Sequence, residues 1–154
     1  MNILFVCLGN ICRSPSAEGV MRQRLEQAGL AAQVALDSAG TAAWHQGKPV
    51  DPRTRLAAQR RGYDLSLLRG RPVVVEDFHR FELILAMDAN NLRDLQAMCP
   101  AHAPAEVDLY LRRYSLQPHE VPDPYYGGEE GFEQVLDLLE EAADRLLADI
   151  RGRL

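Results

Sequence analysis

One stretch decides the fold of this chain: Val6-Cys7-Leu8-Gly9-Asn10-Ile11-Cys12-Arg13-Ser14-Pro15. The run just before it, Ile3 to Val6, is apolar and partly β-branched, which indicates a buried parallel strand. After it, apolar residues recur at helical spacing, namely Ala17, Val20, Met21, Leu25 and Ala28. Pro15 suits the first helical position and Ser14 suits the cap before it. The pattern therefore predicts a strand ending at Cys7, a loop over Leu8–Cys12, and a helix that begins near Arg13.

The predicted turn between strand and helix is suited to binding an anion. Backbone N–H groups converge at such a turn, and the helix dipole adds partial positive charge there. Gly9 is expected to supply the positive φ angle of a tight loop, and the Arg13 guanidinium matches two oxygens of a phosphate. The Cys7 thiol should ionise readily beside a helix amino end and a cation. A thiolate next to a bound phosphoryl group would be a nucleophile.

Two common phosphate-binding motifs do not match this loop. The Gly-Lys-Ser/Thr ending of a nucleotide-binding loop is absent. A Rossmann fingerprint is absent too, because the loop holds a single glycine. The plain structural alternative is a buried, inert Cys7 with Arg13 as a surface charge. The combination of cysteine, five residues, arginine and a hydroxyl residue between strand and helix favours the nucleophile.

The segment from Cys7 to Pro15 resembles the signature of the low-molecular-weight protein tyrosine phosphatases, and the resemblance extends over almost the whole chain. It implies hydrolysis of phosphotyrosine in proteins through a phosphocysteine intermediate. Cys7 would be the nucleophile, while Arg13 and the loop amides would hold the phosphate. The Ser14 hydroxyl could donate to the Cys7 thiolate, cap the helix, or do both. The general acid of the family lies in an Asp-Pro motif, which corresponds to Asp123-Pro124 here. On residue type alone, Asp123 would be an ordinary turn residue.

The resemblance also implies a supporting set around the nucleophile. The phosphate-binding and bracing residues would be Leu8, Gly9, Asn10, Ile11, Cys12, Ser14 and Asp88. The walls of the substrate cleft would be Trp44, Tyr125 and Tyr126. Such a cleft admits an aryl phosphate and keeps the shorter phosphoserine away from the nucleophile. Arg53 either adds positive potential near the mouth of the cleft or is a solvated helix charge.

One position departs from the family pattern. The family usually has a histidine in a Ser-x-His-Arg-x-Arg segment, and this chain has Leu68 there, within Ser66–Arg71. That histidine belongs to the network that braces the phosphate loop. The resemblance therefore does not supply the bracing at this position, although it leaves the nucleophile unaffected.

The rest of the chain alternates strand and helix patterns. Strand patterns cover Gln33–Ala39, Phe81–Ala86 and Val107–Leu111, and helix patterns follow the candidate caps Asp51 and Asp88 and fill residues 132–150. The alternation predicts an α/β fold with a doubly wound, mainly parallel sheet, which binds ligands beyond the carboxyl ends of its strands. The resemblance implies a flavodoxin-like, four-stranded parallel sheet in the order 2-1-3-4, flanked by helices.

The composition is that of an ordinary soluble globular protein, and its 154 residues are expected to form a single phosphatase domain, 1–154. A net charge of −5 argues against broad affinity for nucleic acid. The amino-terminal apolar run is too short to span a membrane and lacks the features of a signal peptide, so we expect a cytoplasmic monomer without membrane insertion. The histidines have no metal-ligand spacing, so no metal and no cofactor are expected. The expected partners are tyrosine-phosphorylated proteins, with inorganic phosphate as the product.

The three cysteines bear on regulation and on alternative reactions. Cys12 is near enough in sequence to pair with Cys7 and protect it from overoxidation; alternatively, it only fills space in the loop. Arsenate reductases of this fold relay a disulfide through further cysteines, and only Cys99 remains for that role. Phosphoarginine phosphatases of similar sequence carry Thr where Ile11 stands, and a hydroxyl there suits a guanidinium. A phosphate-binding module without turnover is disfavoured, because nucleophile, arginine and candidate acid occur together.

Overall fold

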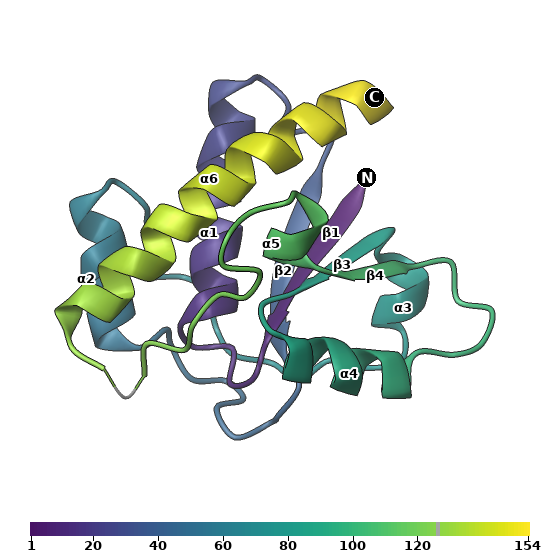
Figure 1. The fold of residues 1–154 in the computed structure, drawn as a ribbon, viewed down its shortest axis with the longest axis horizontal. Helices are drawn as coiled ribbons and strands as arrows, with labels where there is room; N and C mark the ends of the chain where they lie inside the picture. The colour runs from purple at the N-terminus through teal and green to yellow at the C-terminus, as the bar shows by residue number, and fades with distance from the viewer. Residues whose placement is uncertain (126) are drawn as a thin grey trace.

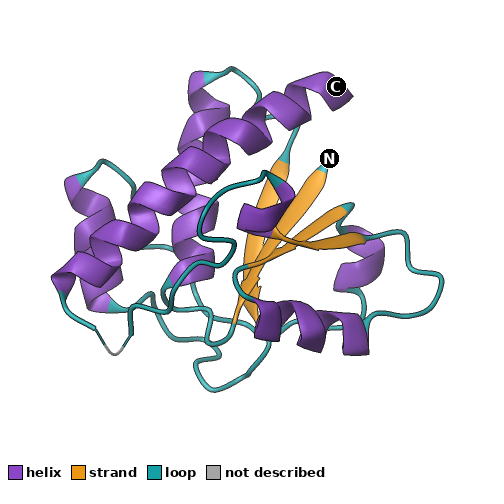
Figure 2. Ribbon diagram, in the orientation of Figure 1, coloured by secondary structure: helices purple, strands orange, loops and turns teal. Residues whose placement is uncertain are grey.

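The computed structural model describes residues 1–125 and 127–154, and a four-stranded sheet forms its centre (Figures 1 and 2). The strands are β1 (Asn2–Cys7), β2 (Ala35–Gly40), β3 (Leu83–Ala86) and β4 (Glu106–Leu109). They are parallel and lie in the order β2-β1-β3-β4. The predicted α/β class and strand order 2-1-3-4 are thus confirmed. Cys7 is the last residue of a central strand, where it pairs with Gly40 of β2.

Helices cover both faces of this sheet (Figure 1). They are α1 (Arg13–Gln27), α2 (Pro52–Arg60), α3 (Asp77–Arg80), α4 (Ala89–Met98), α5 (Tyr110–Arg113) and α6 (Glu129–Arg153). On one face, α1 lies against β1, β2 and the long α6, and α2 packs on α6. On the other face, α4 lies against β3 and β4. None of the described helices is long and apolar enough to cross a membrane.

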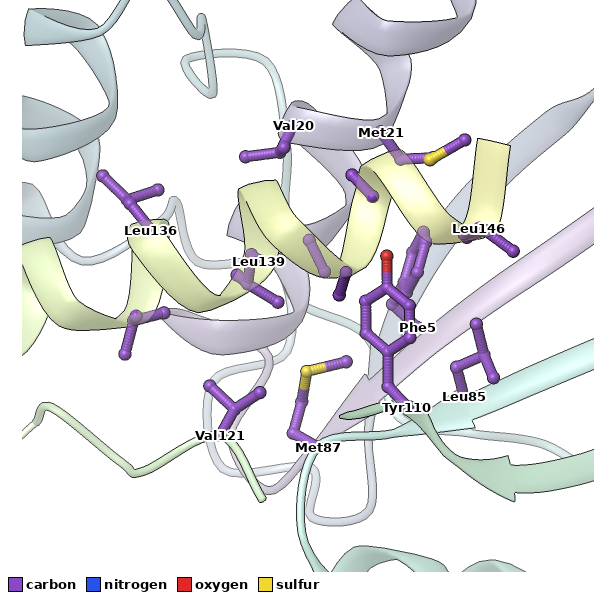
Figure 3. Packing of buried hydrophobic residues seen from close by; sticks show 14 of the residues in the cluster. Phe5, Val20, Met21, Leu85, Met87, Tyr110, Val121, Leu136, Leu139 and Leu146 are labelled. Atoms are coloured by element: carbon purple, nitrogen blue, oxygen red, sulfur yellow. The ribbon is translucent and has the colours of Figure 1, made fainter. Parts of the chain in front are cut away.

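The alternation of side chains along β1 builds a core on each face of the sheet. Phe5 points toward α6, and its ring centroid lies 5.4 Å from that of Tyr110 (Figure 3). Leu4 and Val6 point to the opposite face, into the cluster that contains Phe78 of α3. Burying a side chain of this size stabilises the fold by about 1.5–3 kcal/mol relative to exposure. Burial on both faces therefore fixes β1, and with it the position of Cys7.

Several element boundaries differ from the predicted ones. β2 and β3 each begin two residues later than predicted, and β2 extends to Gly40. β4 ends at Leu109 instead of Leu111, because α5 begins at Tyr110 and turns that ring into the core. The short helices α3 and α5 were not predicted, since four residues are too few to show a helical period.

Two predicted helix caps are confirmed. The Asp51 side chain accepts a hydrogen bond from the Arg53 N–H at 2.8 Å, at the start of α2. The Asp88 side chain accepts one from the Asn91 N–H, also at 2.8 Å. The Asn91 side chain in turn accepts from the Asp88 N–H at 3.2 Å, which completes a capping box at α4.

The predicted cap of α1 is wrong. The helix begins at Arg13, and the residue before it, Cys12, makes no side-chain capping hydrogen bond. Ser14 lies inside the first turn, where its hydroxyl bonds to the Cys7 sulfur instead of to the helix. Pro15 also lies in this first turn, where the missing N–H costs no helical hydrogen bond.

Candidate active site

A pocket of about 150 Å³ opens at the carboxyl end of β1. Its lining residues are Cys7, Leu8, Gly9, Ile11, Cys12, Arg13, Trp44, His45, Asp123 and Tyr125. All of them except His45 belong to the set named from the sequence. Folding thus brings Trp44 and the late Asp123 segment to the Leu8–Cys12 loop. Tyr126, the third expected wall, lies outside the described residues.

Cys7 is buried, at 2% exposed, and its sulfur lies within hydrogen-bonding distance of two groups of the described residues. Ser14 Oγ lies 3.0 Å from the sulfur, and the Asn10 N–H donates to it at 3.3 Å. Ser14 Oγ also accepts a hydrogen bond from Asn10 Nδ2 at 2.8 Å. The Ser14 proton is then free to point at the sulfur, which is nearer than the Ala39 carbonyl at 3.4 Å. Two donors therefore face the sulfur, as the stabilisation of a thiolate requires.

The Asn10 side chain ties the Leu8–Cys12 loop to two other segments. Its Nδ2 donates to Ser38 Oγ of β2 at 3.1 Å, in addition to Ser14. Its Oδ1 accepts from the Arg71 backbone N–H at 2.9 Å. Asn10 has a φ of 57°, in the left-handed region that asparagine tolerates better than most residues. Both amide protons and the amide oxygen are thus in use, in a residue 2% exposed.

Leu68 does not disturb this arrangement. The side chain is partly buried and packs against the core cluster beside α1 and α6. The three hydrogen bonds of the Asn10 side chain go to Ser14, Ser38 and Arg71, and none of them needs a group at position 68. The loop is therefore braced in this chain without the histidine that the family usually has.

The expectation for Gly9 is wrong. Its φ is not positive, and the left-handed residue of the loop is Asn10. A Cβ at position 9 would lie 3.1 Å from Cδ2 of His45, so the His45 ring would have to move by a few tenths of an ångström. At Gly70, a Cβ would lie 2.4 Å from the His45 carbonyl oxygen. These two glycines let the His45 segment pack closely against the loop.

Arg13 is 3% exposed and sits between two carboxylates. Nη1 donates to Asp88 Oδ2 at 2.7 Å and to the Val121 carbonyl at 3.1 Å. Nη2 lies 3.7 Å from Asp123 Oδ2. Burial acts to lower the pKa of the guanidinium, but the Cys7 sulfur, Asp88 and Asp123 outweigh it and raise that pKa above its ordinary value. Arg13 is therefore a permanent positive charge in the pocket wall.

Asp123 is placed at the rim of the pocket, with a side chain that is 40% exposed. Prolines flank it in the sequence, at positions 122 and 124. Its Oδ1 accepts a hydrogen bond from the Tyr125 N–H at 3.0 Å, and its Oδ2 faces Arg13. One oxygen is thus used by the turn, while the other is directed into the pocket.

Cys12 is a second buried thiol next to the pocket, 4% exposed. Burial raises the pKa of this thiol to about 12, against the opposing effect of the neighbouring Thr54 hydroxyl. The charges of Asp51, Cys7 and Asp123 add to the increase. Cys12 is therefore a neutral thiol at neutral pH.

Aromatic side chains stand at the mouth of the pocket. Trp44 is 69% exposed, and Tyr125 stands beside Asp123. The Arg53 guanidinium carbon lies 5.3 Å from the ring centroid of Tyr125 and 4.9 Å from that of Phe132. Arg53 also pairs with the Asp51 carboxylate at 3.0 Å. It is therefore held next to the mouth and is not simply a solvated helix charge.

Sequence reasoning missed three residues at this site: His45, Ser38 and Arg71. They come from segments 28 to 61 residues distant from Asn10, and no spacing pattern in the sequence links them to it. One signal could have found Ser38. It lies near the carboxyl end of a strand predicted to neighbour β1, so its side chain is near the loop that follows β1.

Comparisons with known proteins agree with this geometry. The family model described as low molecular weight phosphotyrosine protein phosphatase matches residues 2–153. A low molecular weight protein-tyrosine-phosphatase of Streptomyces coelicolor is 44% identical, over 99% of this chain and 94% of that protein. A crystal structure of the Entamoeba histolytica protein tyrosine phosphatase, with Hepes in its active site, superposes with a TM-score of 0.94 at 42% identity. That match covers 100% of this chain and 99% of the other.

A Drosophila arginine phosphatase also has this fold, with a TM-score of 0.91 at 28% identity, covering 97% of this chain and 98% of that one. Together, the matched sequence, the strand order and the pocket define the class of protein. The chain belongs to the low molecular weight phosphotyrosine protein phosphatase family. It is accordingly a protein-tyrosine phosphatase, a hydrolase of protein-bound phosphate.

Proposed function

We propose that this protein hydrolyses phosphotyrosine in proteins through a phosphocysteine intermediate on Cys7. In the first step the Cys7 thiolate attacks phosphorus, so that an S–P bond forms and the bond from phosphorus to the tyrosyl oxygen breaks. Arg13 and the backbone amides of the Leu8–Cys12 loop hold the other phosphate oxygens, where negative charge is concentrated. Asp123 donates its proton to the departing tyrosyl oxygen.

In the second step the intermediate is hydrolysed. Asp123, now a carboxylate, takes a proton from the water molecule that attacks phosphorus. The S–P bond breaks, which releases inorganic phosphate and the Cys7 thiolate. The Ser14 hydroxyl, 3.0 Å from the sulfur, stabilises this leaving group by a hydrogen bond. Asp123 is again protonated, and the cycle is closed.

The observation that carries this proposal is the shared pocket of Cys7, Arg13 and Asp123. A protein that only bound phosphate would need the arginine, but it would need neither a hydroxyl directed at the sulfur nor a carboxylate at the rim. Both are present, at 3.0 Å from the sulfur and 3.7 Å from the guanidinium. Their presence supports an enzyme over a silent binding module.

The same chemistry leads to proposals about the substrates, the cofactor requirement and the location of the protein. The substrates we propose are tyrosine-phosphorylated proteins, with the ring held by Leu8, Ile11, Trp44, Tyr125 and Tyr126. The proposed steps use side chains, backbone amides and water, and they call for no metal and no cofactor. We propose that residues 1–154 act as one domain, as a monomer in the cytoplasm, where cysteines stay reduced. An arsenate reductase is not proposed, because only Cys99 remains to relay a disulfide.

Replacing the two central side chains should separate their roles. Cys7→Ser is expected to abolish turnover of a phosphotyrosine peptide, and Asp123→Asn should lower kcat by about 10²–10⁴-fold, the usual contribution of general acid–base catalysis. The measurement is phosphate release, with Asp94→Asn on the exposed face of α4 as the matched control. Unchanged turnover in Asp123→Asn would remove this carboxylate from the mechanism, and appreciable turnover in Cys7→Ser would contradict the proposal itself.

Phosphoarginine is the second candidate substrate, because the chain is also similar to an arginine phosphatase. The pocket wall argues for the aromatic ring, since Leu8 and Ile11 offer a guanidinium no hydrogen-bond acceptor. We expect kcat/KM for a phosphotyrosine peptide to exceed that for the matched phosphoarginine peptide by at least about tenfold. Ile11→Thr should lower this ratio, because a hydroxyl at position 11 suits a guanidinium. A higher value for phosphoarginine in the unchanged protein would reverse the assignment.

Cys12 is proposed to protect Cys7 from irreversible oxidation. Peroxide oxidises the Cys7 thiolate to a sulfenic acid, and the Cys12 sulfur then attacks it, which forms a disulfide and releases water. The attacking species is the thiolate, and burial raises the pKa of Cys12 to about 12. Below that pKa the thiolate fraction grows about tenfold for each pH unit. Closure of the disulfide should therefore accelerate as the pH rises from about 7 to 9.

Peptide mapping by mass spectrometry, at timed intervals after mild peroxide treatment, measures this rate. A matched Cys12→Ser variant should accumulate sulfinic and sulfonic acid at Cys7. The same acids in the unchanged protein, without a Cys7–Cys12 bond at any pH, would contradict a protective role for Cys12.

A further inference from the structure

A second hollow, of about 300 Å³, lies beside the active-site mouth between α2 and the start of α6. Figure 1 shows these two elements side by side, and they are in contact. The lining residues are Arg53, Leu56, Ala57, Arg60, Gly127, Gly128, Glu129, Phe132 and Glu133. We call it the α2–α6 groove. None of the steps of the proposed reaction uses it.

One side chain, Arg53, links the groove to the active-site pocket, although the two hollows share none of the described lining residues. Arg53 lines the groove, and its guanidinium lies over Tyr125 of the pocket and over Phe132 of the groove, at 5.3 and 4.9 Å. The two ring centroids are therefore no more than about 10 Å apart, a span that about three residues of extended chain cover. A peptide with its phosphotyrosine in the pocket can thus reach the groove.

The surface of the groove is suited to an apolar side chain. Leu56 is 47% exposed on α2, although leucines of this chain are mostly buried in the core. Ala57 and Phe132 continue its apolar surface toward α6. Leu56 lies three residues after Arg53 and four before Arg60, so these side chains share one face of the helix.

The charges at the rim are close to balance. Arg53 is paired with Asp51 at 3.0 Å, and Glu133 is paired with Arg61 at 2.8 Å. The remaining charged side chains of the rim, Arg60 and Glu129, have opposite signs. A balanced rim gives neither an acidic nor a basic side chain a net advantage. The exposed leucine is therefore the feature that distinguishes one occupant from another.

We propose that the α2–α6 groove binds an apolar side chain of the substrate, about three residues from the phosphotyrosine. This inference rests on the proposed phosphotyrosine function and gives it a sequence preference. Leu56 is then a specificity-determining residue, which contacts the substrate at a distance from the reacting phosphate. Its contribution is to affinity for the peptide and not to the chemical step.

The test compares phosphotyrosine peptides that carry a single leucine or a single serine at each position up to four residues on either side of the phosphotyrosine. The readout is the ratio of kcat/KM for each leucine peptide to that of its serine counterpart. We expect the ratio to reach about tenfold at one position near the third residue, since partial burial of a leucine is worth about that factor. Leu56→Ser should reduce this ratio to near one.

Leu67→Ser is the matched control, because Leu67 is 87% exposed and does not line the groove. It should leave the ratio at its original value. A ratio near one at every position, with hydrolysis retained, would overturn the proposed role of the groove and leave the phosphotyrosine function standing. A preference that survives Leu56→Ser would overturn it as well. Failure of the unchanged protein to hydrolyse any of the peptides would overturn the phosphotyrosine function and the groove together.

Discussion

The hydrogen bonds of the Asn10 side chain hold the Leu8–Cys12 loop in the shape on which the pocket depends. A left-handed residue other than glycine costs about 1–2 kcal/mol. Each buried hydrogen bond of Asn10 contributes about 0.5–1.5 kcal/mol, and the side chain makes three of them. The hydrogen bonds therefore outweigh the strain. One of them also orients the Ser14 hydroxyl toward the Cys7 sulfur, so the brace of the loop and the environment of the nucleophile are parts of one network.

The two carboxylates that face Arg13 differ in how firmly they are held. Asp88 is fixed by its own capping box at the start of α4 and contacts the guanidinium at 2.7 Å. Asp123 lies on a half-exposed loop and approaches the same guanidinium at only 3.7 Å. The fixed carboxylate of Asp88 pairs with the buried Arg13 guanidinium, because a buried cation without a partner would destabilise the fold. The looser carboxylate is the one with freedom to exchange a proton with a substrate, and this division of roles agrees with the proposed mechanism.

The sequence predicted features formed by residues that are close together in the chain. It did not predict contacts between residues of distant segments, which only folding brings together. Consecutive residues define a strand–loop–helix turn, so the sequence predicted the strand before Cys7 and the helix at Arg13. A helix cap is also a local feature, and the caps Asp51 and Asp88 were predicted for the same reason. For Ser14 the sequence allowed two roles, a helix cap or a hydroxyl donor to the Cys7 sulfur, and spacing does not decide between them; the structure places the hydroxyl 3.0 Å from the sulfur. His45, Ser38 and Arg71 reach the loop from other segments. Gly9 has no positive φ, and what the structure shows there is close packing against His45.

The central claim is that the Cys7 sulfur forms a bond to phosphorus during the reaction. The most direct measurement is to mix the protein with a ³²P-labelled phosphotyrosine peptide, quench it within milliseconds and locate the label by peptide mapping. The proposed mechanism predicts a transient phosphoenzyme with the label on Cys7 and nowhere else, which disappears as inorganic phosphate is released. Turnover with no labelled protein, or with the label on another residue such as His45, would contradict it.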